Sequence, residues 1–304
     1  VDHWPKNAFM LPGFFIALFS QEVFKFDLPS FVIGLLSLCL VSSSNYVLNE
    51  LLDAKTDRAH KEKSKRPVAT GLVSLNEGLI LWGLLAIASF FLSFHLSPSF
   101  GLSVAALWIA GCCYNTPPIR LKDIAYADVL SESINSPIRF LAGWFLVLET
   151  QLPPLSILIA YWFATAFFLA AKRYAEFGSF ASREQATAYR KSFAHYSENM
   201  LLIHLVFYIT TGAFFGGIFI VRHRPELIVI IPLVASFFAY YLKLSLQKDS
   251  PVQSPEKLIR LRFFLLLCVL ILISFIALLI KDVPVIYEIF NLNQSGQPLL
   301  WKIR

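Results

Sequence analysis

The sequence predicts an all-α integral membrane protein with nine transmembrane helices. Hydrophobic residues make up 57% of its 304 positions and charged residues only 15%, whereas a soluble domain has about 45–50% and about 25%. The mean hydropathy is +0.63. This composition excludes a disordered chain, a nucleic-acid-binding arm and most soluble enzymes. We therefore expect the lipid bilayer, and no nucleic acid, as a partner of this chain.

Nine apolar runs are long enough to cross a bilayer, which takes about 20 residues in a helix. They lie near 8–24, 30–51, 74–95, 98–117, 126–148, 153–174, 197–221, 226–246 and 261–281. A soluble helical bundle would show polar stripes at helical spacing, and the run from Phe264 to Ile280 shows none. The four cysteines lie inside apolar runs without a metal-binding spacing, so we predict neither a zinc site nor a disulfide framework.

The basic residues predict the orientation of the chain. With the N-terminus inside, 19 of the 26 Lys and Arg residues fall in inside segments and six in outside segments. Because positive charge accumulates on the cytoplasmic side, we expect the N-terminus and the long polar loops 52–73 and 175–196 inside. We therefore expect the active site to face the cytoplasm at a prokaryotic plasma membrane.

A row of oxygen-bearing side chains ends the second expected helix. Asn45, Asn49, Asp53 and Asp57 are four residues apart, and residues at this spacing share one helix face. Hard oxygen ligands suit Mg²⁺, which also binds substrate phosphates, and polar groups at membrane level tend to be functional. The alternative is a solvated helix end whose acids pair with neighbouring bases. The row favours a magnesium site.

Basic residues follow this row directly, at Lys61, Lys63, Lys65 and Arg66. Such side chains suit a diphosphate, which guanidinium groups bind with two hydrogen bonds. The alternative is that they only mark the cytoplasmic side of the membrane.

These segments resemble the UbiA superfamily of intramembrane prenyltransferases. The first signature of that family is an Asn-Asp-x-x-Asp-x-x-x-Asp run, which reads here as Asn49-Glu50-Leu-Leu-Asp53-Ala-Lys-Thr-Asp57, with Glu at its second position. The following Lys65-Arg66-Pro67-Val-Ala-Thr-Gly71 also fits. The resemblance implies a single domain over residues 1–304 whose helices surround a central cavity open to the cytoplasmic side.

The second long loop points to one branch of the family. Residues 172–196 contain no aspartate, whereas aromatic prenyltransferases carry a second aspartate-rich run there. The grouping Lys172-Arg173-Tyr174-Ala-Glu176, with Trp4-Pro-Lys6-Asn7, is similar to the decaprenyl-phosphate phosphoribosyltransferase branch. That resemblance implies transfer of 5-phosphoribose from phosphoribosyl diphosphate to a polyprenyl phosphate. A basic loop suits a lipid phosphate acceptor, although Lys172 and Arg173 could simply mark a helix end.

A third inside loop and the fifth expected helix add polar residues. Tyr114 and Lys122 match the tyrosine-to-lysine stretch of the family in this loop. Asp128, Asn135 and Arg139 lie at offsets of seven and four, which places them on roughly one helix face. An arginine at membrane depth is costly unless paired or solvated, so Arg139 is expected to line a polar cavity or to join a buried ion pair.

The resulting hypothesis divides the candidate residues by role. Asn49, Asp53 and Asp57 would bind Mg²⁺, and Lys6, Arg66 and Lys122 would bind the diphosphate or the 5-phosphate. Lys172, Arg173 and Arg190 would hold the acceptor phosphate, while Tyr174 and Glu176 orient the ribose. Further substrate-binding candidates are Asn7, Asn45, Arg58, Tyr114, Asp128 and Arg139.

Two other functions compete with this hypothesis. One is an aromatic prenyltransferase of the same fold that uses a polyprenyl diphosphate donor, which the missing second aspartate run disfavours. The other is a polytopic transporter of an anionic solute. Transporters tend to carry broken helices near the membrane midplane, whereas the polar residues here gather at the expected inner face.

Overall fold

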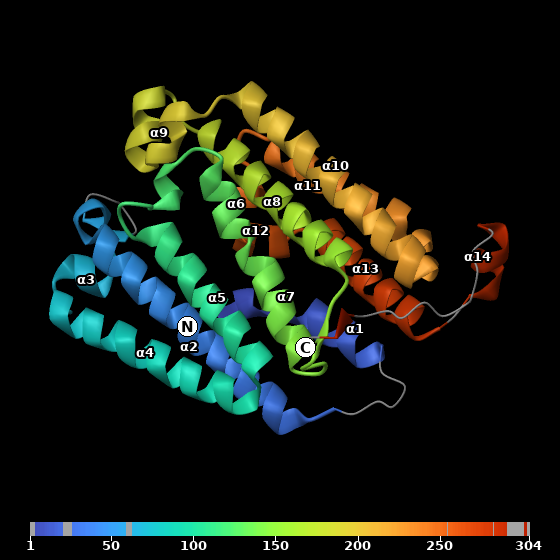
Figure 1. Cartoon of the computed structure of the whole chain (residues 1–304). Coiled ribbons are helices and arrows are strands. Elements are labelled where there is room, and N and C mark those ends of the chain that lie inside the picture. The colour runs from blue at the N-terminus through green and yellow to red at the C-terminus, as the bar shows by residue number, and fades with distance from the viewer. Residues whose placement is uncertain are drawn as a thin grey trace. The chain divides into compact units, whose positions relative to one another are not determined.

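The computed structural model describes residues 4–20, 26–58, 63–253, 255–281, 283–290 and 301–302 (Figure 1). The chain divides into two compact units, which are described separately. Unit 1 comprises Val1–Lys122, Ile134–Leu152 and Lys302–Arg304, and unit 2 comprises Asp123–Ser133 and Pro153–Trp301.

The described part of unit 1 consists of helices, connecting loops and a two-residue strand, and it also includes Lys302 of the strand Trp301–Lys302. Its elements are η1 (Trp4–Met10), α1 (Leu11–Phe19), α2 (Leu28–Asp57), η2 (Lys63–Lys65), α3 (Pro67–Thr70), α4 (Leu75–Leu96), α5 (Pro98–Asn115), α7 (Asn135–Phe145) and β1 (Gln151–Leu152). The short η3 (Leu121–Asp123) ends one residue beyond Lys122.

Small residues let the helices of unit 1 approach closely, as is usual at interfaces between membrane helices. On α2 and α4, the hydroxyls of Ser37 and Ser89 each donate to the other's backbone carbonyl, at 3.0 and 2.8 Å. A Cβ on Gly143 of α7 would lie 2.0 Å from the carbonyl oxygen of Met10. The contact between η1 and α7 therefore leaves no room for a residue larger than glycine at position 143.

Unit 2 contains α6 (Ala127–Ser133), α8 (Leu155–Phe177), α9 (Arg183–Tyr189), η4 (Lys191–His195), α10 (Glu198–His223), η5 (Pro225–Ile230), α11 (Ile231–Ser245), η6 (Pro251–Gln253), α12 (Pro255–Ile259), α13 (Arg262–Ile280) and α14 (Pro284–Ile289). The strand β2 (Trp301–Lys302) begins at Trp301, which is the last residue of unit 2. Helix α8 packs against α10, α6 and α11. A buried core joins α8, α10 and α11 through Phe167, Ala170, Tyr208 and Tyr241.

Six helical segments among the described residues are long and apolar enough to cross a membrane. They are α2, α4, α8, α10, the continuous η5–α11 segment Pro225–Ser245, and α13. These segments coincide with six of the nine expected runs, so the protein is an all-helical membrane protein with multiple spans. The other three runs are occupied by the shorter η1–α1 and α5 and by the interrupted α6–α7.

The run expected as one helix over 126–148 consists of two helices that meet at Ile134. Pro137 explains the interruption, because proline has no N–H to donate to the carbonyl four residues earlier, that of Ser133. This carbonyl instead accepts a hydrogen bond from the Thr165 hydroxyl at 3.3 Å. The continuous fifth helix expected from the sequence was therefore wrong.

Candidate active site

The end of α2 presents oxygens to a lysine that follows α5. The Lys122 Nζ lies 2.9 Å from Asn49 Oδ1 and 2.8 and 2.7 Å from the two carboxylate oxygens of Asp53. The amide oxygen of Asn115, at the end of α5, lies 3.0 Å from the same nitrogen. Asn49 and Asp53 reach one partner because their four-residue spacing puts them on one helix face.

A second cation binds Asp53. Arg120 Nη2 lies 2.7 Å from Asp53 Oδ1, and its Nη1 donates to the backbone carbonyl of Asn115 at 3.4 Å. Arg120 has a φ of +32°, outside the regions that non-glycine residues commonly occupy. Asn115 and Arg120 were not among the predicted site residues. The Pro117-Pro118 pair in the same loop was the available signal, because it marks a turn that brings Arg120 back toward α2.

The other acidic residue of the row has a different partner. Asp57 is 4% exposed, and Arg66 Nη1 donates to its Oδ2 at 2.7 Å. Arg58 Nε donates to the carbonyl of Ala69 at 3.1 Å, which joins the end of α2 to α3. The predicted ligand Asp57 therefore faces a guanidinium, while Asn49 and Asp53 face Lys122. Lys61, also predicted here, lies outside the described residues.

Deeper in unit 1, Asn45 packs against α5. Its Nδ2 donates to the carbonyl of Leu107 at 3.0 Å, and its buried Oδ1 has no hydrogen-bond partner among the residues that the structure describes. A Cβ on Gly111 would lie 2.3 Å from this amide, so only glycine allows the approach. Tyr114, on the same helix, is partly buried.

A separate polar cluster joins η1, α2 and α7. Asn7 is fully buried, and its Oδ1 accepts hydrogen bonds from Arg139 Nε at 3.0 Å and from the Ser42 hydroxyl at 3.1 Å. Arg139 also donates to the carbonyl of Asn135 at 3.3 Å. Lys6 is exposed and donates to the Tyr46 hydroxyl at 2.9 Å. The sequence placed Asn7 and Arg139 in the site, and the structure shows that they contact each other.

The oxygens around Lys122 match the ligand preference of a hard cation. Two amide oxygens and one carboxylate surround a positive charge, the donor type that Mg²⁺ takes in proteins. Within the described part of the chain, no group of three or more His, Cys, Asp or Glu side chains is placed to hold a metal. Two of the three side chains around Lys122, Asn49 and Asn115, are amides, and Asp53 is the one carboxylate among them. The oxygen atoms present therefore fit a hard cation such as Mg²⁺.

In unit 2, Asp128 accepts hydrogen bonds from several donors although it is fully buried. Arg173 Nε lies 3.2 Å, the Ser192 hydroxyl 3.2 Å and Arg190 Nη1 3.4 Å from its Oδ2. The Tyr196 hydroxyl donates to Oδ1. Burial and the charge of Asp128 raise the pKa of the Tyr196 phenol. Asp128 thus connects α6, α8 and the segment from η4 to α10.

Arg173 is 2% exposed and binds three carboxylates. Besides Asp128, it donates to Glu132 at 2.7 Å and to Glu176 at 3.1 Å. Lys172 Nζ lies 3.8 Å from Glu176, with a third of its side chain exposed. The network therefore contains as many basic as acidic side chains, with Lys172 and Arg190 the most accessible cations. Tyr174 packs beside it against the cluster around Phe193.

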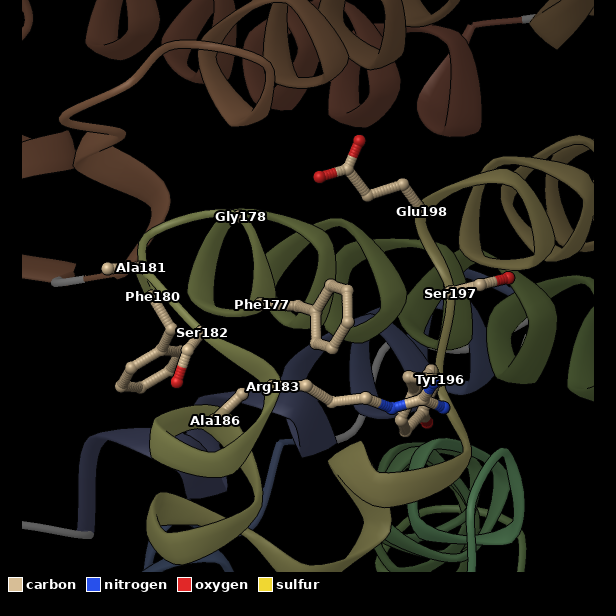
Figure 2. Close-up of a pocket in the computed structure, with 10 residues that line it drawn as sticks. All are labelled: Phe177, Gly178, Phe180, Ala181, Ser182, Arg183, Ala186, Tyr196, Ser197 and Glu198. Atoms are coloured by element: carbon tan, nitrogen blue, oxygen red, sulfur yellow. The ribbon is translucent and has the colours of Figure 1, made fainter.

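A pocket of about 320 Å³ opens between the end of α8, α9 and the start of α10. Figure 2 shows the Arg183 side chain extending from α9 toward Tyr196. Arg183 Nη2 donates to the carbonyl of Ala194 at 2.5 Å. Because Tyr196 lines this pocket and also binds Asp128, the pocket borders the buried network of unit 2. The sequence did not predict Tyr196, whose contact with Asp128 spans 68 residues.

Six segments long enough to cross a membrane, together with paired acidic and basic side chains, define a polytopic membrane protein with a charged polar site. Residues 9–268 match the UbiA prenyltransferase family. The chain belongs to that family, as its sequence resemblance implied.

Relatives and solved structures agree with this assignment. The chain is 32% identical over 213 residues to decaprenyl-phosphate phosphoribosyltransferase from Mycolicibacterium smegmatis, covering 65% of this chain and 61% of that protein. It is 28% identical over 204 residues to the protein of the same name from Mycobacterium tuberculosis, covering 65% and 64%. The matches thus span less than two thirds of these relatives. A UbiA homologue from Archaeoglobus fulgidus bound to DMAPP and Mg²⁺ has a TM-score of 0.70 at 21% identity, covering 91% of this chain and 96% of that one. This likeness shows the fold.

Proposed function

We propose that the protein transfers 5-phosphoribose from phosphoribosyl diphosphate to a polyprenyl phosphate, with Mg²⁺, at the cytoplasmic face of a prokaryotic membrane. The observation that carries this proposal is the interleaving of oxygen ligands and cations at the end of α2. Asn49 and Asp53 face Lys122 and Arg120 within hydrogen-bond distance. A metal-bound diphosphate needs both kinds of group. In the proposed arrangement, nine spans surround a cavity open to the cytoplasm.

The phosphoribosyl donor is favoured by the second loop and by the relatives. Residues 172–196 carry no aspartate for a second metal-binding run. Lys172 and Arg190 retain exposed parts beside the Asp128 network. These cations suit an acceptor that bears a phosphate group. The aromatic ring that accepts a prenyl group is not such an acceptor. The M. smegmatis relative is named for the phosphoribosyl reaction.

Asn49, Asp53 and, as predicted from the sequence, Asp57 would hold the Mg²⁺. When bound, this ion supplies Lewis-acid stabilisation of the leaving diphosphate. Lys122, Arg120 and Arg66 bring three positive charges to the same helix end, each now beside a carboxylate. In the proposed complex they donate to diphosphate oxygens. This places positive charge where negative charge develops as the ribose C1–O bond breaks.

The acceptor phosphate is already anionic, so its oxygen attacks C1 without a strong general base. The new C1–O bond forms as the electron pair of the old one leaves with the diphosphate. Lys172 and Arg190 hold the acceptor phosphate in this scheme. Arg173, bound to three carboxylates, fixes the positions of Glu176 and Asp128. Orientation and electrostatics then supply most of the rate.

One experiment separates the candidate functions. Purified protein in lipid nanodiscs is given Mg²⁺, polyprenyl phosphate and phosphoribosyl diphosphate labelled in the ribose. A parallel reaction contains labelled prenyl diphosphate with an aromatic acceptor. We expect labelled product, separated from unreacted donor by chromatography, only from the phosphoribosyl donor. Labelled product only from the prenyl donor would establish an aromatic prenyltransferase, and no turnover with either would favour the transporter.

A further inference from the structure

Lys122 occupies the centre of an oxygen cage built by two helices. Four oxygens lie between 2.7 and 3.0 Å from its Nζ, from Asn49 and Asp53 of α2 and Asn115 of α5. An ammonium group has three N–H donors, so four close oxygens exceed the number of hydrogen bonds it can make singly. The arrangement is that of a cation surrounded by ligands.

The cage is built for a charge that stays away from water. Lys122 is 9% exposed and Asn115 4% exposed, and lysine is almost never so buried unless it is paired. Asn115 Nδ2 donates to the carbonyl of Gly111 at 2.9 Å. This bond fixes the amide, so its Oδ1 is turned toward Lys122. Asn115 therefore presents an oxygen to the cage by its own local structure.

We propose that Lys122 is a tethered cation that holds the metal position of the metal-free protein, and that Asn115 is an oxygen ligand of that position. This inference rests on the metal site of the proposed function. Mg²⁺ binds oxygen at about 2.0–2.1 Å, so the cage must contract around it and the ammonium must leave. The metal ion and the ammonium cannot both occupy the centre of this cage.

The exchange couples the metal to the diphosphate. Without an anion nearby, displaced Lys122 loses its partners, so metal binding is weak. With a diphosphate present, Lys122 would move onto a phosphate oxygen, and Asn115 would join Asn49, Asp53 and Asp57 as residues that hold the metal. Each ligand then strengthens binding of the other, as linkage requires. Arg120 remains beside Asp53, because its Nη1 is also held by the carbonyl of Asn115.

The test measures binding of Mn²⁺ by electron paramagnetic resonance, with and without inorganic pyrophosphate, in wild-type protein and in Lys122→Met. Methionine keeps the volume of the side chain and removes its charge. Without pyrophosphate, we expect Lys122→Met to bind Mn²⁺ at least tenfold more tightly than wild type. The enhancement by pyrophosphate should shrink in this variant. Lys122→Gln replaces it if Lys122→Met does not fold.

Lys55→Met is the matched control, because Lys55 is exposed near the same end of α2. It removes the same charge from the same helix end, and we expect its Mn²⁺ affinity to stay within twofold of wild type. An equal gain in both variants would overturn the proposal, since it would reflect general electrostatics. So would an unchanged or weaker affinity in Lys122→Met.

Asn115→Leu in the Lys122→Met background tests the second part. We expect it to weaken Mn²⁺ binding at least fivefold, and an unchanged affinity would show that Asn115 is not a ligand. Phosphoribosyl transfer by wild-type protein is assayed in the same preparation. If the Mn²⁺ affinities shift as expected but no phosphoribose is transferred, the proposed reaction alone is rejected. If transfer is normal but the Mn²⁺ affinity of the variants is unchanged, the cation exchange alone is rejected.

Discussion

Replacing Asp128 with Asn should destabilise unit 2 more than neutralising Glu132, a partly exposed acid in the same polar network. The carboxylate is fully buried and accepts hydrogen bonds from Arg173, Arg190, Ser192 and Tyr196. Asparagine has nearly the same shape but carries no charge, and one of its terminal atoms is a donor. Donors that now face an oxygen would therefore face an N–H₂ group.

The expected magnitude follows from the number and burial of these bonds. A hydrogen bond to a charged group contributes about 1.5–3 kcal/mol, and breaking a buried ion pair costs about 3–5 kcal/mol. Asparagine keeps one acceptor oxygen, and Arg173 keeps Glu132 and Glu176. We therefore expect Asp128→Asn to lower the free energy of unfolding by about 2–4 kcal/mol.

Glu132→Gln is the matched control. Its carboxylate binds the same Arg173, at 2.7 Å, but 29% of its side chain is exposed. Solvent screens such a pair, so its loss should cost about 1 kcal/mol. Unfolding is followed by circular dichroism in detergent, with increasing fractions of a denaturing detergent. A loss for Asp128→Asn no larger than that for Glu132→Gln would refute the account of this network.

Two further changes test other parts of the structure. Gly111→Ala would place a Cβ 2.3 Å from Asn45 and should cost about 1–3 kcal/mol of unfolding free energy. Gly83→Ala, inside α4 and with no described atom within 4 Å of its Cβ, should not lower stability in the same assay, because alanine is the better helix former. The pKa of the Tyr196 phenol is raised by burial and by Asp128, so the native state keeps a proton that the unfolded chain loses above about pH 10. Stability should therefore fall as pH rises above that value, and the fall should be smaller in Tyr196→Phe; identical alkaline unfolding profiles would contradict this assignment.

The long membrane helices could be predicted from the sequence because their signal is local. A run of apolar residues such as that in α13 has no stable alternative to a helix in lipid, where every backbone polar group must be satisfied internally. The interruption at Ile134 follows from Pro137, whose missing N–H leaves the carbonyl of Ser133 in need of another donor. That donor is Thr165, 32 residues away, so hydropathy alone does not reveal it.

In the candidate site too, contacts set by the spacing within one helix could be predicted, whereas pairings with residues of other segments could not. The four-residue spacing of Asn49 and Asp53 predicted a shared face, and both contact Lys122. The same spacing did not reveal that Asp57 pairs with Arg66, or that Asn115 completes the oxygen cage. Such pairings depend on how α2, α5 and the loops pack, which no spacing within one helix encodes.

The central claim is that the carboxylate of Asp53 serves the departure of a diphosphate. The most direct test is the rate of transfer of labelled phosphoribose to polyprenyl phosphate, with Mg²⁺, by Asp53→Asn. Asp27→Asn, an exposed change at the opposite end of α2, is the control. We predict a loss of at least about 100-fold for Asp53→Asn, or about 2.7 kcal/mol of transition-state stabilisation, and a rate within twofold of wild type for Asp27→Asn. Full activity in Asp53→Asn would contradict the claim.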